Sequence, residues 1–291
     1  MPTTAILPLL TRIADSLERM APPPADPTIV DDPTQDAFLW QGADGRLLPI
    51  PQMQAVPLDL LKGIDRQIKQ VMGNTRFFAH GLAANNVMLW GARGMGKSSL
   101  VKACLLAINE EQRKNGQPPL ALIEIPRDDL NTLPQLLALL RRSTRRVILF
   151  CDDLSFETQD ADYKSLKSVL DGGIAGRPDN VLVYATSNRR HLMPQNMIEN
   201  ESGDAIHPGE AIEEKVSLSD RFGLWIGLYG ASQPHYLSII DAYAADRKLP
   251  IAKDELHRRA LQWSIQRGSR SGRVASQFIT ALSAELAEET R

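Results

Sequence analysis

The stretch that decides the fold is Gly91-Ala-Arg-Gly-Met-Gly-Lys-Ser98, which lies between the apolar run 86–90 (NVMLW) and the amphipathic run 99–110 (SLVKACLLAINE). The first run predicts a buried strand, and the second predicts a helix with an apolar face. In a glycine-rich turn from strand to helix, successive backbone N–H groups and the helix N-terminus point at an anion. The octapeptide therefore predicts a phosphate site.

The octapeptide also matches the P-loop pattern, in which two glycines flank four residues and Lys-Ser follows. Lys97 is predicted to neutralise the β- and γ-phosphates of a nucleotide, and the Ser98 hydroxyl is predicted to complete the shell of a Mg²⁺ ion. The glycines allow the backbone to approach the phosphates closely. The residues expected to bind nucleotide here are Gly91, Ala92, Arg93, Gly94, Met95, Gly96, Lys97, Ser98 and Ser99.

Two adjacent carboxylates, Asp152 and Asp153, end the apolar run 146–151 (RVILFC). Neighbouring carboxylates repel one another, so a turn without a nearby cation would rarely contain them. Asp152 is predicted to be the Mg²⁺ partner. Asp153 is predicted to orient or deprotonate the attacking water.

Five short apolar runs, separated by helical stretches, indicate the fold class. Strands that are buried on both faces are continuously apolar, and these runs predict a five-stranded parallel sheet with helices on both faces. Beyond residue 231 only helical spacing remains, which predicts a small all-helical lid. The expected α/β domain spans 55–230 and the lid 231–291; the five runs are 86–90, 121–125, 146–151, 180–185 and 222–229.

Three segments precede that domain. Residues 1–21 predict an amphipathic helix, interrupted by charges such as Arg12, that packs on the protein body or on a neighbouring chain rather than acting as a signal peptide or membrane span. Residues 22–34 are rich in proline and predict a linker. Residues 35–54 predict a β-hairpin around a Gly-Ala-Asp-Gly turn, placed before the main domain.

The composition excludes a strong global electrostatic field. The chain has 291 residues, with 33 basic and 35 acidic side chains and a formal net charge of −2. No overall charge attracts it to nucleic acid or to a membrane, so a basic surface would have to be local. Cys104 and Cys151 lie in apolar runs, which indicates buried, reduced thiols and a cytoplasmic location.

Several motifs over residues 55–291 resemble those of AAA+ ATPases. TSNRR follows the fourth predicted strand, where the family has its sensor-1 residue, so the resemblance implies that Asn188, with Thr186 and Ser187 as the next candidates, helps to place the attacking water. LSDRFGLWI is similar to the arginine-finger segment, and this implies that Arg221 reaches the γ-phosphate held by a neighbouring subunit. Without the resemblance, Arg221 is equally an arginine at a helix end that pairs with Asp220 or caps carbonyls.

The same resemblance implies a lid contact and a base site. RGSRSGRVASQF is similar to the sensor-2 segment, in which Arg273, or alternatively Arg270, contacts the nucleotide of its own chain. LLKGIDRQ is similar to the segment that lines adenine, which places Gly63 and Ile64 beside the base. The guanine-reading Asn-Lys-x-Asp motif is not seen in the sequence, so ATP is favoured over GTP.

The motifs together are similar to a bacterial family of predicted AAA+ ATPases that is classed as a domain of unknown function. Two features depart from the wider superfamily. Asp153 stands where glutamate is usual, which withdraws the carboxylate by roughly 1.5 Å, and Glu157 or a shifted backbone would have to compensate. Residues 126–146 contain no aromatic-hydrophobic-glycine triplet, so threading of a client through a pore is not expected.

The resemblance implies a homo-oligomer, a ring such as a hexamer or a partial ring, that hydrolyses ATP with Mg²⁺ at subunit interfaces and moves or remodels a protein client. The alternative is a nucleotide-gated binding module or loader that acts on DNA or on a DNA-bound protein, with RRSTRR (141–146) and NRRH (188–191) as a local basic patch. A small-molecule kinase is disfavoured because the arginines lie before the fifth strand and in the carboxyl-terminal helices.

Overall fold

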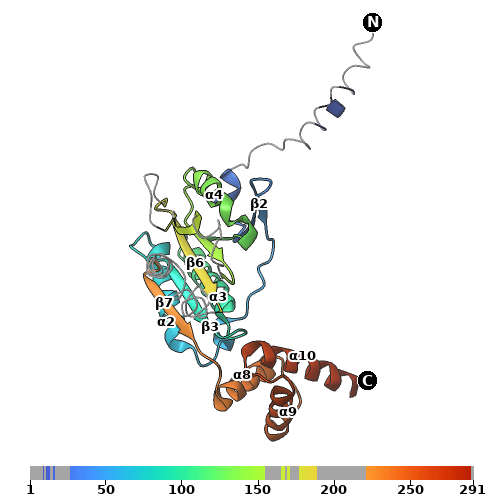
Figure 1. The fold of residues 1–291 in the computed structure, drawn as a ribbon. Helices are drawn as coiled ribbons and strands as arrows, with labels where there is room; N and C mark the ends of the chain where they lie inside the picture. Colours follow the sequence, from blue (N-terminus) through green and yellow to red (C-terminus); the bar gives the residue numbers. More distant parts are fainter. Residues whose placement is uncertain are drawn as a thin grey trace, which may run out of the picture.

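A computed structural model describes residues 27–154, 165–167, 169–170, 177–188 and 221–289, together with residues 9, 11–13 and 16. These residues form an α/β domain around one sheet, followed by a group of helices beyond the end of that sheet (Figure 1). None of the helices in this part of the chain is long and apolar enough to cross a membrane.

The sheet has seven strands in the order β2-β1-β4-β5-β6-β3-β7. The five strands that correspond to the five predicted runs all pair in parallel, so the predicted fold class is confirmed. Strands β5 and β6 lie in the centre and are buried along their whole length, which explains the uninterrupted apolar sequence of β5 and the apolar run 181–185 of β6. The five are β3 (Val87–Gly91), β4 (Ala121–Glu124), β5 (Val147–Cys151), β6 (Val181–Ser187) and β7 (Leu224–Leu228).

Helices cover both faces of the sheet. One apolar cluster joins α2 (Asp65–Ala79) and α3 (Lys97–Lys114) to the sheet. A second cluster joins α4 (Leu133–Leu140) to the other face, together with the 3₁₀ segment η3 (Arg127–Thr132). Alternate residues of the central strands point into opposite clusters, as the pleat requires.

The hairpin of β1 (Ala37–Gln41) and β2 (Arg46–Pro49) extends this sheet. Strand β1 pairs in parallel with β4, so the sheet has seven strands where the sequence predicted five. Trp40 is fully buried, and its indole N–H donates to the Thr132 hydroxyl at 2.7 Å. Burial of Trp40 and Phe38 under the α4 side fixes the hairpin at the sheet edge.

The end of the proline-rich segment also packs against the sheet domain. It contains the 3₁₀ segment η1 (Pro27–Asp31), in which Val30 is fully buried. The buried Arg145 guanidinium donates to the carbonyls of Val30, Asp32 and Gln35 at 2.6–3.0 Å. Residues 30–35 are therefore held by the domain and do not form a free linker.

Of the predicted amino-terminal helix, residues 9, 11–13 and 16 are described and are helical. The side chains of Leu9 and Ile13 are 56% and 55% exposed. The other residues of 1–26 lie outside the described part of the chain.

The carboxyl-terminal lid consists of α8 (Gln233–Asp246), α9 (Lys253–Gln266) and α10 (Gly272–Glu289). Its own apolar core contains Tyr236, Ile240, Ala260 and Phe278. Ser232 begins α8 as an N-cap that accepts from the His235 N–H. The predicted all-helical lid is confirmed, and it lies past the carboxyl end of β3 (Figure 1).

Candidate functional site

The predicted phosphate-binding loop leads from the carboxyl end of β3 into α3. Gly91 has φ +132°, and any Cβ there would clash with the Leu228 carbonyl, so glycine is needed where the loop passes β7. The Ala92 N–H donates to the same carbonyl at 3.2 Å. Strand β7 therefore anchors the start of the loop.

Lys97 lies inside this loop and is 7% exposed. Its ammonium donates to the carbonyls of Gly91 (2.8 Å) and Ala92 (3.0 Å) and to Asn188 Oδ1 (2.9 Å). Burial lowers the pKa of Lys97, while the nearby carboxylates of Asp153 and Asp152 oppose this shift. A buried cation at the start of a helix is suited to an anionic ligand.

The two acids of β5 are linked to the loop and to β6 by a chain of hydrogen bonds. The Ser98 hydroxyl donates to Asp152 Oδ1 at 2.6 Å, and the Thr186 hydroxyl donates to the same atom at 2.5 Å. The backbone N–H of Asp153 donates to Thr186 Oγ1 at 2.9 Å. Asn188 Nδ2 donates to Asp153 Oδ1. The structure thus brings together Lys97, Ser98, Asp152, Asp153 and Asn188.

Asp153 has an unusual backbone, with φ +53°. For a residue with a side chain, the left-handed region costs about 1–2 kcal/mol. Thr186 compensates by accepting the Asp153 N–H while it is itself 1% exposed. Sequence reasoning ranked Thr186 behind Asn188 as a candidate for placing the water and did not predict its contacts with the two acids; its position two residues before Asn188, on the strand beside β5, is the signal that was available.

The predicted base-side residues lie under the first lid helix. Gly63 has φ +72°, and a Cβ there would clash with the His235 ring of α8. His235 Nε2 is 2.7 Å from the Lys62 carbonyl, and Ile64 is buried at the start of α2. His235 was not predicted, because the sequence does not show that α8 returns to this turn.

Arg273 lies at the other end of the site, in the first turn of α10. Its backbone N–H donates to the Gly94 carbonyl at 3.2 Å, and its charge acts on Lys97. Arg270 instead lines a separate pocket with Ile265 and Gly230. The structure therefore places Arg273, rather than Arg270, beside the phosphate-binding loop.

Arg221 is not brought to this site within the chain. It lies three residues before β7, at the amino edge of the sheet, since β7 begins opposite Val87. The loop leaves β3 at the opposite, carboxyl edge. Two further residues of the sequence analysis, Asp220 and Glu157, lie outside the described residues.

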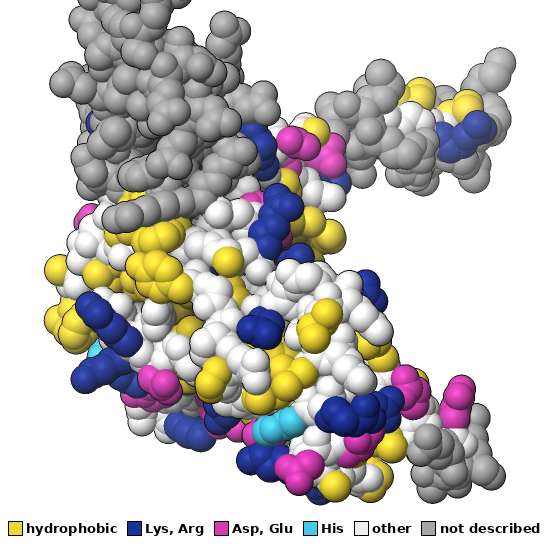
Figure 2. Space-filling view, turned by 60° about the horizontal axis from the view of Figure 1, so that its bottom comes forward, with side chains coloured by type: hydrophobic (Ala, Val, Ile, Leu, Met, Phe, Trp, Pro, Cys, Tyr) yellow, Lys and Arg dark blue, Asp and Glu magenta, His cyan; other side chains and the backbone are white. Residues whose placement is uncertain are grey.

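Of the two basic segments considered for DNA binding, the structure describes RRSTRR and Asn188, while residues 189–191 lie outside the described residues. RRSTRR precedes β5 at the amino edge, whereas Asn188, the first residue of NRRH, follows β6 at the carboxyl edge of the same parallel sheet. Arg145 is buried and donates to backbone carbonyls. On the face shown in Figure 2, basic and acidic side chains are interspersed.

The strand order and the loop define the class, a mostly parallel α/β fold in which a glycine-rich loop joins β3 to α3, with a carboxyl-terminal helical lid. Within this class, the chain belongs to the family described as "Protein of unknown function (DUF815)", which matches residues 33–286. No curated protein matches the sequence.

Among solved structures, the chain is similar to the T158V variant of Thermotoga maritima RuvB, with a TM-score of 0.48 and 15% identity over 77% of this chain and 71% of that one. The Thermotoga maritima RuvB Holliday junction branch migration motor gives a TM-score of 0.43, with 14% identity and the same coverage. Aeropyrum pernix ORC1 in complex with DNA gives 0.46, with 14% identity over 78% and 68% of the two chains.

Proposed function

We propose that this protein is a Mg²⁺-dependent ATPase that acts as a homo-oligomer and uses ATP to move or remodel a client. The observation that carries the proposal is the hydrogen-bonded chain from Lys97 and Ser98 to the two acids that follow β5 and on to Asn188, which follows β6. Residues from three neighbouring strands meet at one edge of the sheet, which is where α/β folds bind ligands.

The phosphates of ATP would be bound by the backbone N–H groups of residues 91–99 and by Lys97. To reach them, the Lys97 ammonium exchanges its present carbonyl acceptors for phosphate oxygens, which carry full negative charge. Arg273 is placed to add a second positive charge from the lid, and Gly63 and Ile64 are placed to line adenine. These are the roles that the sequence predicted for the same residues.

The Mg²⁺ site would use the hydroxyl of Ser98 and the carboxylate of Asp152, which already lie 2.6 Å apart. Both are oxygen ligands, the type that Mg²⁺ prefers, and phosphates and water complete its shell in such sites. When bound, the ion neutralises negative charge that develops on the phosphates.

Asp153 and Asn188 are proposed to handle the attacking water. Asn188 contacts Lys97 through its Oδ1 and Asp153 through its Nδ2, so one amide connects the phosphate-binding group with the proposed base. Asp153 reaches roughly 1.5 Å less far than glutamate would. We expect slow hydrolysis in which the placement of Asp153 limits the rate.

The proposed oligomer follows from the position of Arg221. Because Arg221 lies at the edge opposite its own loop, it would act on the nucleotide of a neighbouring subunit. The test is phosphate release per chain from Mg-ATP over a wide range of protein concentration. A specific rate that rises with concentration supports the shared site. A flat rate, together with a monomeric mass at the lowest active concentration, would remove Arg221 from it.

Paired variants sharpen this test. Asp153→Ala should keep ATP binding and stop turnover, and Arg221→Ala should cost on the order of 10³-fold in turnover. Mixing the two inactive variants should restore some activity, because a mixed interface can combine an intact Asp153 with an intact Arg221. Absence of recovery in mixtures of proven hetero-oligomers argues against action in trans.

The alternative, a nucleotide-gated module or loader on DNA, shares the same ATP site and differs in its output. Within RRSTRR, Arg145 is buried and donates to backbone carbonyls, so this arginine is not available to DNA, and hydrolysis that acts on a protein client is the proposal. Retention on DNA at low salt that occurs only with ATP and weakens as salt is added would reverse this choice.

A further inference from the structure

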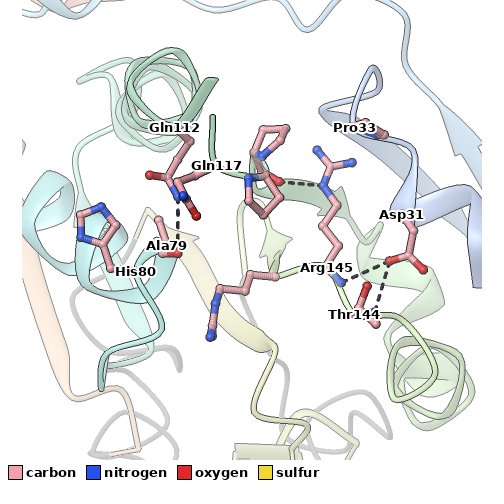
Figure 3. Close-up of a pocket in the computed structure, with 11 residues that line it drawn as sticks. Asp31, Pro33, Ala79, His80, Gln112, Gln117, Thr144 and Arg145 are labelled. Carbon is pink, nitrogen blue, oxygen red and sulfur yellow. Dashed lines mark hydrogen bonds between the residues drawn. The ribbon is translucent and has the colours of Figure 1, made fainter. Parts of the chain in front are cut away.

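A second pocket lies at the edge of the sheet opposite the phosphate-binding loop (Figure 3). It has a volume of about 630 Å³, within the usual range of small-molecule sites. Its walls come from the end of α2, the segment before β4, the segment before β5 and residues 31–33. The five-residue strands β3 and β5 separate it from the loop by roughly 16 Å.

One wall of this pocket is built on hydrogen bonds made by Asp31 and Arg145. Asp31 Oδ1 accepts from the Ser143 hydroxyl and from the backbone N–H groups of Thr144 and Arg145. The Arg145 guanidinium donates to the Pro119 carbonyl at 2.8 Å and to further carbonyls around it. Figure 3 shows both residues on one side of the pocket, with His80 and Gln112 across from them.

Arg146 supplies a positive charge that these contacts do not neutralise. Its guanidinium carbon lies 5.6 Å from the centre of the Phe78 ring, and a Cβ on Gly81 would lie 2.6 Å from its Nη2. Within the described ranges, no carboxylate forms an ion pair with Arg146. Among the described residues of the pocket lining, Asp31 is the one acid, and its Oδ1 already accepts three hydrogen bonds.

The remaining lining matches an organic anion. The exposed imidazole of His80 and the side-chain amide of Gln117 add hydrogen-bonding groups to the lining. Pro33, Pro118 and Ala79 supply apolar walls for a carbon skeleton. A planar guanidinium that is held on an aromatic ring is well suited to bind a carboxylate with two parallel hydrogen bonds.

We propose that this pocket is a second ligand site, which binds a small organic carboxylate independently of the nucleotide site. Arg146 is the group that would bind the carboxylate. The lining also includes Arg145, whose guanidinium holds residues 30–35 against the domain. A carboxylate bound there would contact the segments that enter β4 and β5.

The test is calorimetric titration of the full chain with glutarate, without nucleotide or Mg²⁺. Wild-type protein should bind glutarate at one site per chain, and Arg146→Ala should weaken binding by at least roughly tenfold. Arg142→Ala removes the same charge from an exposed residue outside the pocket lining, and it should bind like the wild type. Gln117→Trp, which fills the pocket from an exposed position, should block binding without unfolding the protein.

Three results would overturn the proposal. The first is no saturable binding of glutarate, and the second is an equal loss with Arg142→Ala, which would show unspecific attraction to positive charge. The third is loss of binding with Lys97→Ala, which would place the anion in the phosphate-binding loop. Since none of these measurements uses ATP, failure here leaves the proposed ATPase untouched, and an inactive ATPase leaves this test valid.

Discussion

Replacing Thr186 by valine tests how Asp152 and Asp153 are positioned. Valine has nearly the shape of threonine and lacks the hydroxyl. In the structure that one hydroxyl donates to Asp152 Oδ1 at 2.5 Å and accepts the Asp153 N–H at 2.9 Å, and the residue is 1% exposed. The substitution therefore removes both contacts and introduces almost no change in packing.

The size of the effect follows from these contacts. A buried N–H without an acceptor costs about 1–3 kcal/mol, and a lost hydrogen bond to a carboxylate costs about 1.5–3 kcal/mol. Asp152 keeps its bond from Ser98, so we expect a total loss of about 2–4 kcal/mol in the free energy of unfolding. Asp153, with φ +53°, also loses the bond that holds it in the left-handed region. A displacement of about 1 Å would lower turnover about 10²-fold.

The assay combines urea unfolding, binding of a fluorescent ATP analogue and phosphate release at saturating ATP. Thr186→Val should lose stability and turnover and keep most of its nucleotide affinity, while Thr186→Ser should restore turnover to within about threefold of wild type. Thr75→Val is the matched control, because its 1%-exposed hydroxyl bonds Val71 and Tyr184 away from the site. Equal loss of turnover in Thr75→Val, or wild-type turnover in Thr186→Val, would refute a positioning role.

Three further outcomes are expected. Lys97→Ala should weaken ATP binding by roughly 10²-fold or more in equilibrium titration, because it removes the buried cation of the loop. Arg145→Ala should lower the free energy of unfolding in urea by about 3–5 kcal/mol, whereas the exposed Arg142→Ala should change it by less than about 0.5 kcal/mol. Burial raises the pKa of Cys104 and Cys151 from 9.0 to about 12, so neither thiol should react with maleimide at pH 8 until the protein unfolds. Because the unfolded thiols ionise first, unfolding releases protons above pH 9, and thermal stability should fall as the pH rises from 9 towards 12.

The parallel core was predictable because its strands are buried on both faces. The sequence of β5 is apolar at every position, and a short uninterrupted apolar run has few other interpretations. The place of the hairpin was not predictable. Strand β1 pairs with β4, which lies about 80 residues further along the chain, and nothing local in either strand specifies this partner. The packing of residues 30–35 was not predictable for the same reason, because it depends on Arg145, a buried arginine far along the chain.

The candidate site was predictable where chemistry and local structure coincide. Lys97 and Ser98 follow a glycine-rich turn, and Asp152 and Asp153 end a buried strand, so residue type and position indicated the same function. Contacts between elements were not accessible in this way. Thr186 is an ordinary β-branched strand residue until the register shows that it lies beside the acids of β5.

The contacts between lid and loop add a constraint on how the two can move. The Arg273 N–H donates to the Gly94 carbonyl, and His235 lies 2.7 Å from the Lys62 carbonyl, so the lid is joined to the main chain at both ends of the site. A Cβ on Gly94 would lie 2.9 Å from Ser271 Oγ, so the loop and the start of α10 fit together only with glycine there. If phosphate binding moves Gly94, α10 must follow or the hydrogen bond must break. A main-chain hydrogen bond that either holds or breaks can convert a small shift at a ligand into the rotation of a whole subdomain.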